Sequence, residues 1–176
     1  MLKNRHCRME EVLQTERLRI RRFNVDDALF VMQLTNTEDW LRNIGDRNTG
    51  TEELARQYLE DGNIRSYREH GYGGYLVELK ETGEPIGMCG LFKRDMLEHP
   101  DIGFAFLPAH YGKGYGLEIA SAVLKYALND LKLPTVLGIT LPSNTGSIRL
   151  LEKIGLSCKG IIKLPGDNDE LLLYST

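Results

Sequence analysis

The stretch DIGFAFLPAHYGKGYG, residues 101–116, contains an apolar run that ends at a proline, followed by a turn with three glycines. The run 102–107 is too short for its periodicity to decide its type, but its length and the proline at 108 favour a buried strand. Apolar residues then recur at helical spacing over about 116–131, which predicts a long helix. The stretch therefore predicts a strand, a glycine-rich turn and a helix in direct succession.

The glycine-rich turn has two interpretations. Glycines at 112, 114 and 116 remove side chains where the backbone could approach a ligand closely. The free amides of the helix's first turn, with the positive end of the helix dipole behind them, would then bind a phosphate or pyrophosphate. Alternatively, the glycines only let the strand and the helix pack tightly. The turn by itself leaves both interpretations open.

Two common nucleotide sites match the turn poorly. A Rossmann site needs G-x-G-x-x-G and an acidic residue at the end of the next strand. Here the spacing is G-x-G-x-G, and the next predicted strand ends with Thr140-Leu141-Pro142, without a carboxylate. The P-loop pattern G-x-x-x-x-G-K-[ST] is absent as well. A nucleotide-binding protein is therefore only a third alternative among the function classes.

The remaining chain predicts a single α/β (α+β) domain over residues 1–176, of which about the first 12 could form an extension. Period-2 patterns and short apolar runs predict about seven mostly antiparallel strands. They lie at 15–23, 75–80, 86–92, 102–107, 136–141, 157–163 and 170–175, with a turn at 165–168. Helices are expected after the capping residues Asn24, Thr51 and Asn144 and at 63–70, with stops at Gly62, Gly71 and Gly155. The segment 101–141 forms a strand–helix–strand unit, whose two strands should be parallel.

The first predicted strand carries a row of arginines. Arg17, Arg19 and Arg21 alternate with Leu18 and Ile20, which is the pattern of a half-buried strand. The row is expected to form a solvated face, with phosphate binding as the alternative.

Composition and cysteine content exclude several classes of protein. The chain is 41% hydrophobic and 27% charged with a net charge of −3, which is typical of a globular protein without a basic footprint for nucleic acid. The three cysteines are odd in number and widely spaced, which argues against a disulfide framework and a zinc site and fits a reducing compartment. No apolar segment follows the basic residues near the start, and no apolar run approaches the ~20 residues of a membrane span. We expect a cytoplasmic protein without a metal, nucleic-acid or membrane partner.

Three stretches together resemble the GNAT (Gcn5-related N-acetyltransferase) superfamily. They are the strand and turn 102–118, the segment NTGSIRLLEKIGL at 144–156, and the opening TERLRIR at 15–21. The opening resembles the branch that contains the ribosomal-protein N-terminal acetyltransferases RimJ and RimL. The resemblance covers about residues 13–175 and implies an acetyl-CoA-dependent enzyme, in which the parallel strands 101–107 and 136–141 splay apart.

The resemblance also implies which residues bind coenzyme A. Backbone amides of the turn would hold the pyrophosphate; its residues are Tyr111, Gly112, Lys113, Gly114, Tyr115 and Gly116. The first of them departs from the family's Arg or Gln, but binding by amides tolerates this change. Phe106 and Leu107 would pair with the pantetheine arm and polarise the thioester carbonyl. Asn144 matches an asparagine that contacts this arm, although it could serve only as an N-cap.

The catalytic acid is less well matched. In many family members a tyrosine seven positions after the asparagine protonates the leaving thiolate, and this position is Leu151 here. Ser147 lies where RimL-like enzymes carry a serine, and we take it as the candidate acid. Its hydroxyl could instead bond within the first turn of the helix.

The catalytic base and the acceptor pocket follow from the same resemblance. Asp101, at the start of the central strand, lies where the family often has a carboxylate that acts through water, with Glu98 and His99 as rivals. A charged residue in this place could equally be solvated. His110 is expected in a surface loop. Trp40, Tyr67 and Tyr72 fall in the region that lines the family's acceptor pocket, although such aromatics are often core residues.

The sequence therefore predicts transfer of an acetyl group to a primary amine by direct attack, without a covalent enzyme intermediate. The acceptor could be a peptide N-terminus or a small-molecule amine. A non-catalytic acyl-CoA-binding module is the alternative, because the family's tyrosine acid is missing. Members of the family often form homodimers, so a homodimer is a further expectation.

Overall fold

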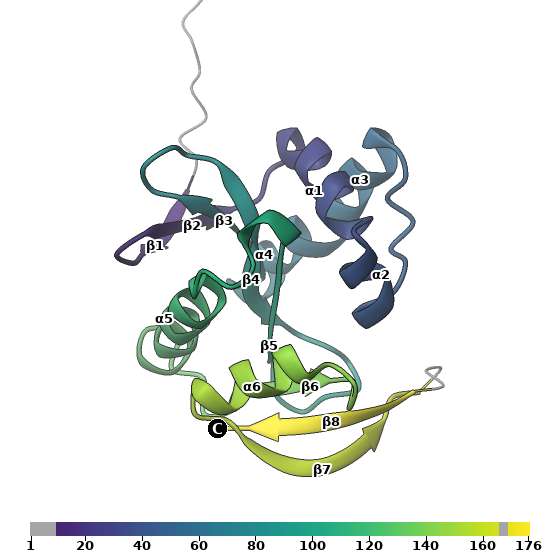
Figure 1. The fold of residues 1–176 in the computed structure, drawn as a ribbon, viewed down its shortest axis with the longest axis vertical. Helices are drawn as coiled ribbons and strands as arrows, with labels where there is room; N and C mark the ends of the chain where they lie inside the picture. Colours follow the sequence, from purple (N-terminus) through teal and green to yellow (C-terminus); the bar gives the residue numbers. More distant parts are fainter. Residues whose placement is uncertain (1–9, 166–168) are drawn as a thin grey trace, which may run out of the picture.

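A computed structural model describes residues 10–165 and 169–176 (Figure 1). The strands form one mixed sheet in the order β1-β2-β3-β4-β5-β6-β8-β7. Their bounds are β1 Glu11–Gln14, β2 Leu18–Arg22, β3 Gly74–Leu79, β4 Pro85–Phe92, β5 Asp101–Phe106, β6 Leu137–Thr140, β7 Ser157–Lys163 and β8 Glu170–Ser175. In the described part of the chain only β5 and β6 are parallel, and every other neighbouring pair is antiparallel. The predicted class and the parallel pair are confirmed, and β1 brings the strands of the described residues to eight.

The expected first strand, 15–23, is wrong at its start. The chain instead makes a hairpin in which β1 pairs with β2, and the Thr15 amide donates to the Leu18 carbonyl at 2.8 Å. β1 lies where an extension was expected for about the first 12 residues. The expected turn at 165–168 falls partly on 166–168, which lie outside the described residues.

The helices between β2 and β3 depart most from expectation. Asn24 forms the predicted cap, as part of a capping box around a 3₁₀ turn at Val25–Asp27. The helices are α1 Ala28–Thr35, α2 Glu38–Asn43, α3 Glu52–Leu59 and α4 Arg65–His70. No helix was expected at α2. Gly62 does not stop α3, because a π-helical turn at Glu60–Ile64 carries the chain on into α4, which ends at Gly71 in the left-handed region.

The helices cover both faces of the sheet. Figure 1 shows α1–α3 on one side of β4 and β5 and α5, Tyr115–Asn129, on the other. Neighbouring residues of β4 point to the two cores: Cys89 packs with α5, and Met88 packs with α1 and α3. The last helix, α6 Thr145–Lys153, contacts β6 and β7. Among the described residues, none of the helices has both the length and the apolar character of a membrane span.

The parallel strands β5 and β6 separate along their length. Asp101 and Leu137, the first residues of the two strands, are their only paired residues. Beyond this pair the two strands diverge toward their carboxyl ends, as expected for the splayed pair. Backbone groups of β5 on this side therefore lack a neighbouring strand, which in a sheet leaves them free to bind another molecule.

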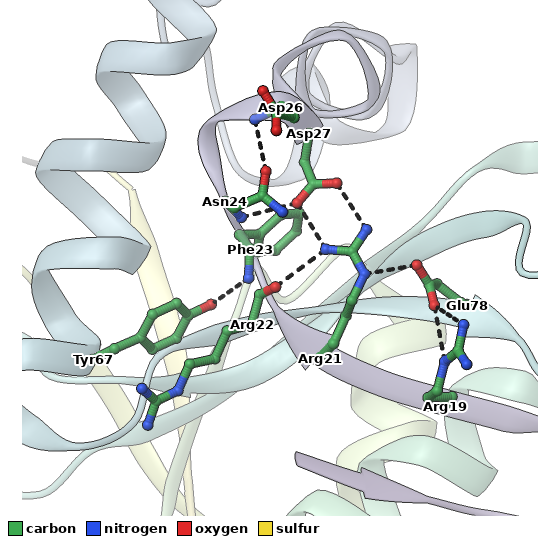
Figure 2. Close-up of polar contacts among 9 residues, drawn as sticks. All are labelled: Arg19, Arg21, Arg22, Phe23, Asn24, Asp26, Asp27, Tyr67 and Glu78. Carbon is green, nitrogen blue, oxygen red and sulfur yellow. Dashed lines mark hydrogen bonds and ion pairs between the residues drawn. The ribbon is translucent and has the colours of Figure 1, made fainter. Parts of the chain in front are cut away.

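The arginine row of β2 is not a uniformly solvated face. Arg21 is buried and donates to both Asp27 and Glu78 at 2.8 Å, and Arg19 donates to the second oxygen of Glu78 (Figure 2). The side chains of Arg21 and Glu78 are only 6% and 3% exposed. Burial works against the charge of Arg21, but hydrogen bonds to Asp27 and Glu78 outweigh it and raise its pKa. The network is thus structural, and joins β2, β3 and the start of α1.

Candidate functional site

A cavity of about 920 Å³ opens between the separated ends of β5 and β6. Most of the predicted site residues line it: Asp101, Phe106, Tyr111, Gly112, Gly114, Tyr115, Gly116, Asn144 and Ser147. Leu107 and Lys113 do not, and neither do the rival bases Glu98 and His99. The structure therefore brings the strand end, the glycine turn and the start of α6 to one place.

The glycine turn ends in a helix with an open N-terminus. Gly112 and Gly114 have φ angles of +72° and +80°, in the left-handed region that side chains other than glycine disfavour. α5 begins at Tyr115 with Gly114 as its N-cap, and no side chain among the described residues caps it. The first amides of this 15-residue helix therefore face the cavity with the positive end of the dipole. This arrangement fits an anionic ligand such as a pyrophosphate.

Arg17, in the turn between β1 and β2, holds the glycine turn through hydrogen bonds. Its guanidinium donates to the Lys113 carbonyl at 2.9 Å and to the Glu118 carboxylate at 2.7 Å, and it lies 4.6 Å from the centre of the Tyr115 ring. The Thr15 hydroxyl also donates to Glu118, at 2.6 Å. Burial raises the pKa of Glu118, but the bonds from Thr15 and Arg17 outweigh it and lower the pKa. Arg17 therefore contacts the turn itself, and the sequence did not suggest this role.

The backbone of β5 alternates between two partners. The Leu107 amide donates to Ile86 of β4 at 2.9 Å, so Leu107 is directed away from the cavity. In an antiparallel pair such bonds recur at every second residue, so the even-numbered residues of β5 direct their backbone groups toward β6. Phe104 and Phe106 have this direction and line the cavity. Both backbone groups of Leu107 are thus bonded within the protein, since its carbonyl also accepts from the His110 amide at 2.9 Å, whereas those of Phe104 and Phe106 face the open side of the strand.

Asn144 and Ser147 lie together at the start of α6. The Asn144 side-chain oxygen accepts from the Ser147 amide at 3.1 Å, so Asn144 is an N-cap and also lines the cavity. Within the described residues, the Ser147 hydroxyl has no hydrogen-bond partner, so the alternative bond within the helix's first turn is not formed. A hydroxyl is thus available at the positive end of α6.

Asp101 is a buried carboxylate rather than a solvated one. It is 2% exposed, and its oxygens accept from Arg94 at 2.7 and 3.4 Å. Burial raises the pKa of Asp101, and the Arg94 guanidinium acts in the opposite direction. Asp101 begins β5 and Phe106 ends it, so about 17 Å of strand separates the carboxylate from the glycine-turn end of the cavity.

His110 is not a surface residue, which corrects the expectation from the sequence. It is 9% exposed, because the segment 108–110 packs between the strand end and Tyr115. Its Nε2 lies 3.5 Å from Glu84, and its Nδ1 has no hydrogen-bond partner within the described residues.

The three aromatic candidates separate into two groups. All three are buried in the core, but Trp40 also lines the cavity, whereas Tyr67 and Tyr72 do not. The Tyr67 hydroxyl accepts from the Phe23 amide (Figure 2). It also donates to the Gly74 carbonyl, so it serves the fold. Tyr58 of α3, which the sequence did not suggest, reaches the cavity wall. Among residues 10–165 and 169–176, no group of three or more His, Cys, Asp or Glu residues could hold a metal.

A family model described as an acetyltransferase (GNAT) domain matches residues 17–157. The protein YkkB of Bacillus subtilis is 36% identical over 105 residues, which is 57% of this chain and 61% of that protein. The chain therefore matches less than two thirds of that relative's length.

Two solved structures extend the comparison to nearly the whole chain. The crystal structure of a GNAT-family acetyltransferase from Bacillus anthracis has a TM-score of 0.77 and 29% identity, and covers 93% of this chain and 96% of that one. A ribosomal-protein-S5-alanine acetyltransferase from Vibrio fischeri also has a TM-score of 0.77, with 18% identity and coverage of 93% and 94%. The second likeness confirms a shared fold with the ribosomal-protein branch.

Proposed function

Because the chain belongs to the acetyltransferase (GNAT) family, we propose that it transfers the acetyl group of acetyl-CoA to a primary amine. One observation carries the proposal: the uncapped start of α5, preceded by glycines of positive φ, opens into the cavity between β5 and β6. The acceptor would be a peptide N-terminus or a small-molecule amine. Cys89 and Cys158 are both free thiols, which supports a location in the cytoplasm because cysteines stay reduced there.

The donor would bind mainly to the backbone. The amides of the glycine turn and the first turn of α5 would hold the pyrophosphate, and each bond to a charged group contributes about 1.5–3 kcal/mol. The free backbone groups of Phe104 and Phe106 would pair with the pantetheine arm, so that the thioester lies along β5 toward Asp101. Arg17 would act on this donor only indirectly, since it fixes the carbonyl of Lys113.

The reaction requires a neutral amine and a protonated leaving group. As the amine nitrogen bonds to the carbonyl carbon, the carbon–sulfur bond breaks, the nitrogen loses a proton and the thiolate gains one. An α-amino group with a pKa of about 7.7–8.0 requires little help, whereas a lysine amine at about 10.4 requires a base. Asp101 would accept the amine's proton through water, and Ser147 would supply the proton to the thiolate. The positive end of α6 would stabilise that thiolate.

A thiol-release assay tests the proposal directly. We expect acetyl-CoA to be consumed only when an amine is present, with one acetylated amine formed for each thiol released. Binding of acetyl-CoA without transfer to any member of a broad amine panel would instead indicate the non-catalytic binding module.

Ser147→Ala should lower kcat by about a hundredfold, the usual contribution of a positioned acid. The Kd for acetyl-CoA, measured by calorimetry, should stay the same because the hydroxyl is not part of the pyrophosphate site. Thr145→Ala is the matched control, since Thr145 is exposed in the same turn and does not line the cavity. An unchanged kcat in Ser147→Ala would show that this serine is not the acid.

Arg94→Met should move the acid limb of the kcat/KM profile to higher pH. A base must be ionised to act, and activity falls as pH drops through its pKa. Burial already raises the pKa of Asp101, and loss of the opposing guanidinium would raise it further. Asp101→Asn should remove this limb and lower the rate at every pH. An acid limb that is the same in all three proteins would exclude Asp101 as the base.

A further inference from the structure

One wall of the cavity is formed by α2, α3, the connection between these two helices and the connection between β4 and β5. Its charged and polar side chains include Asp39, Arg42, Arg47, Tyr58 and Arg94. Asp39 of this wall contacts the side chain of Tyr111 at the start of the glycine turn. Since the donor would occupy the glycine turn and β5, this wall is left for the acceptor. We call it the acceptor wall.

The charges of the acceptor wall do not cancel. Arg42 is paired with Glu38 and Asp39, and Arg94 is paired with Asp101. Arg47 donates only to the Ile44 carbonyl, at 3.2 Å, and has no carboxylate partner in the described part of the chain. The wall therefore presents one unpaired positive charge.

The carboxylates of the cavity, by contrast, already have partners. The described lining contains two acidic side chains, Asp39 and Asp101, and each is in an ion pair with an arginine. A second ammonium group on the acceptor, as in a polyamine, would find no free carboxylate here. Leaving such a charge unpaired in a partly enclosed site is unfavourable.

Tyr58 adds a hydrogen-bond donor beside the unpaired arginine. Its ring is half-buried in the wall, and within the described residues its hydroxyl has no hydrogen-bond partner. Burial raises the pKa of Tyr58, while Arg47 and Arg94 are close enough to act in the opposite direction. At neutral pH the phenol stays protonated, so it can donate to an anion that Arg47 also binds.

We propose that the acceptor amine carries a carboxylate a few bonds from its nitrogen, and that Arg47 and Tyr58 bind this carboxylate. A guanidinium and a phenol together supply the donors that a carboxylate accepts. The amine would then point toward Asp101, at the other end of the Arg94 ion pair. This inference rests on the proposed acetyl transfer, and it specifies the acceptor class of the same site.

The experiment compares acceptors that differ only in this charge. The peptide pair is Ser-Glu-Glu and Ser-Gln-Gln, each with a free N-terminus and an amidated C-terminus, and the small pair is glycylglycine and glycylglycinamide. Spermidine serves as the polycation. We expect kcat/KM for the carboxylate member of at least one pair to exceed that of its amide by about tenfold, with spermidine poorest. Which pair shows the preference tells whether the carboxylate lies on a side chain or at a chain end.

Arg47→Gln tests the residue that carries the charge. The carboxylate-to-amide ratio should fall toward one, and Tyr58→Phe should lower it less because the positive charge remains. The Kd for acetyl-CoA checks that both variants keep the donor site. Arg65→Gln is the matched control: it removes another exposed arginine, on α4, that does not line this cavity, so the ratio should persist.

Three patterns of rates among the probes and variants would overturn the inference. They are equal rates within both pairs, a preference for spermidine, or a ratio that Arg47→Gln leaves unchanged. Transfer to none of the five probes overturns it as well, because it requires a carboxylate-bearing acceptor among them. The proposed acetyl transfer is judged separately, by the broad amine panel and by binding of acetyl-CoA.

Discussion

Gly114→Val is expected to weaken acetyl-CoA binding by at least about a hundredfold, because it would disturb several charge-assisted bonds from the turn at once. Gly114 has a φ of +80°, where a β-branched residue is strongly disfavoured. A Cβ atom there would also lie 3.4 Å from the Arg17 guanidinium that braces the turn. To relieve the strain, the backbone must rotate, and the amides at the start of α5 turn away from the ligand. Calorimetry with acetyl-CoA measures the loss.

The control for this variant is Gly71→Val. Gly71 has nearly the same φ, +79°, at the end of α4, and a Cβ there would meet no atom within 4 Å. Both variants should lose comparable stability from backbone strain, but only the change at Gly114 should affect the Kd. Full affinity in a folded Gly114→Val protein would exclude the glycine turn as the donor site.

Arg21→Met is expected to lower the free energy of unfolding by about 3–5 kcal/mol, the usual effect of breaking a buried ion pair from one side. The substitution leaves Asp27 without its guanidinium and Glu78 with Arg19 alone, on side chains that are 10% and 3% exposed (Figure 2). Asp27 also closes the capping box of Asn24, so the start of α1 should loosen too. Urea unfolding followed by circular dichroism measures the change.

Arg19→Met is the control for this variant, because it removes the more exposed of the two arginines that bind Glu78. Arg19 shares Glu78 with Arg21, but its side chain is 31% exposed, so water can replace it at a cost of about 1 kcal/mol or less. A similar small loss in both variants would mean that the network contributes little to stability.

Local patterns were sufficient for the part of the site that is local in sequence. The strand 101–106, the glycine turn and α5 follow one another directly, and their signals are short apolar runs, glycines and helical spacing. The cap at Asn144 and the left-handed Gly155 are also local. For this reason most residues that line this part of the cavity could be named from the sequence, whereas Leu107 and Lys113 do not line it.

The remaining features depend on contacts between distant residues. Arg21 meets Glu78 across 57 positions, and Arg17 meets Lys113 across 96, so no window of the sequence contains both partners. The direction of Leu107 depends on its register with β4, which period-2 patterns do not report. At Gly62 a local signal was misleading: glycine often ends a helix, but here a π-helical turn carries the helical chain on past α3. Arg47 and Tyr58 acquire a common role only when the fold places them on one wall.

In the proposed enzyme, the free edge of β5 and the start of α5 would recognise the donor through main-chain atoms, which every residue has. The acceptor wall would act through individual side chains on α2, on α3 and between them. Changes of side chain on that wall can therefore redirect the enzyme to a new acceptor while its use of the coenzyme is inherited intact. A deletion of one residue within β5 would instead impair the use of the coenzyme. It would exchange the backbone groups that face β4 with those that face β6, and it would not alter any side chain of the acceptor wall.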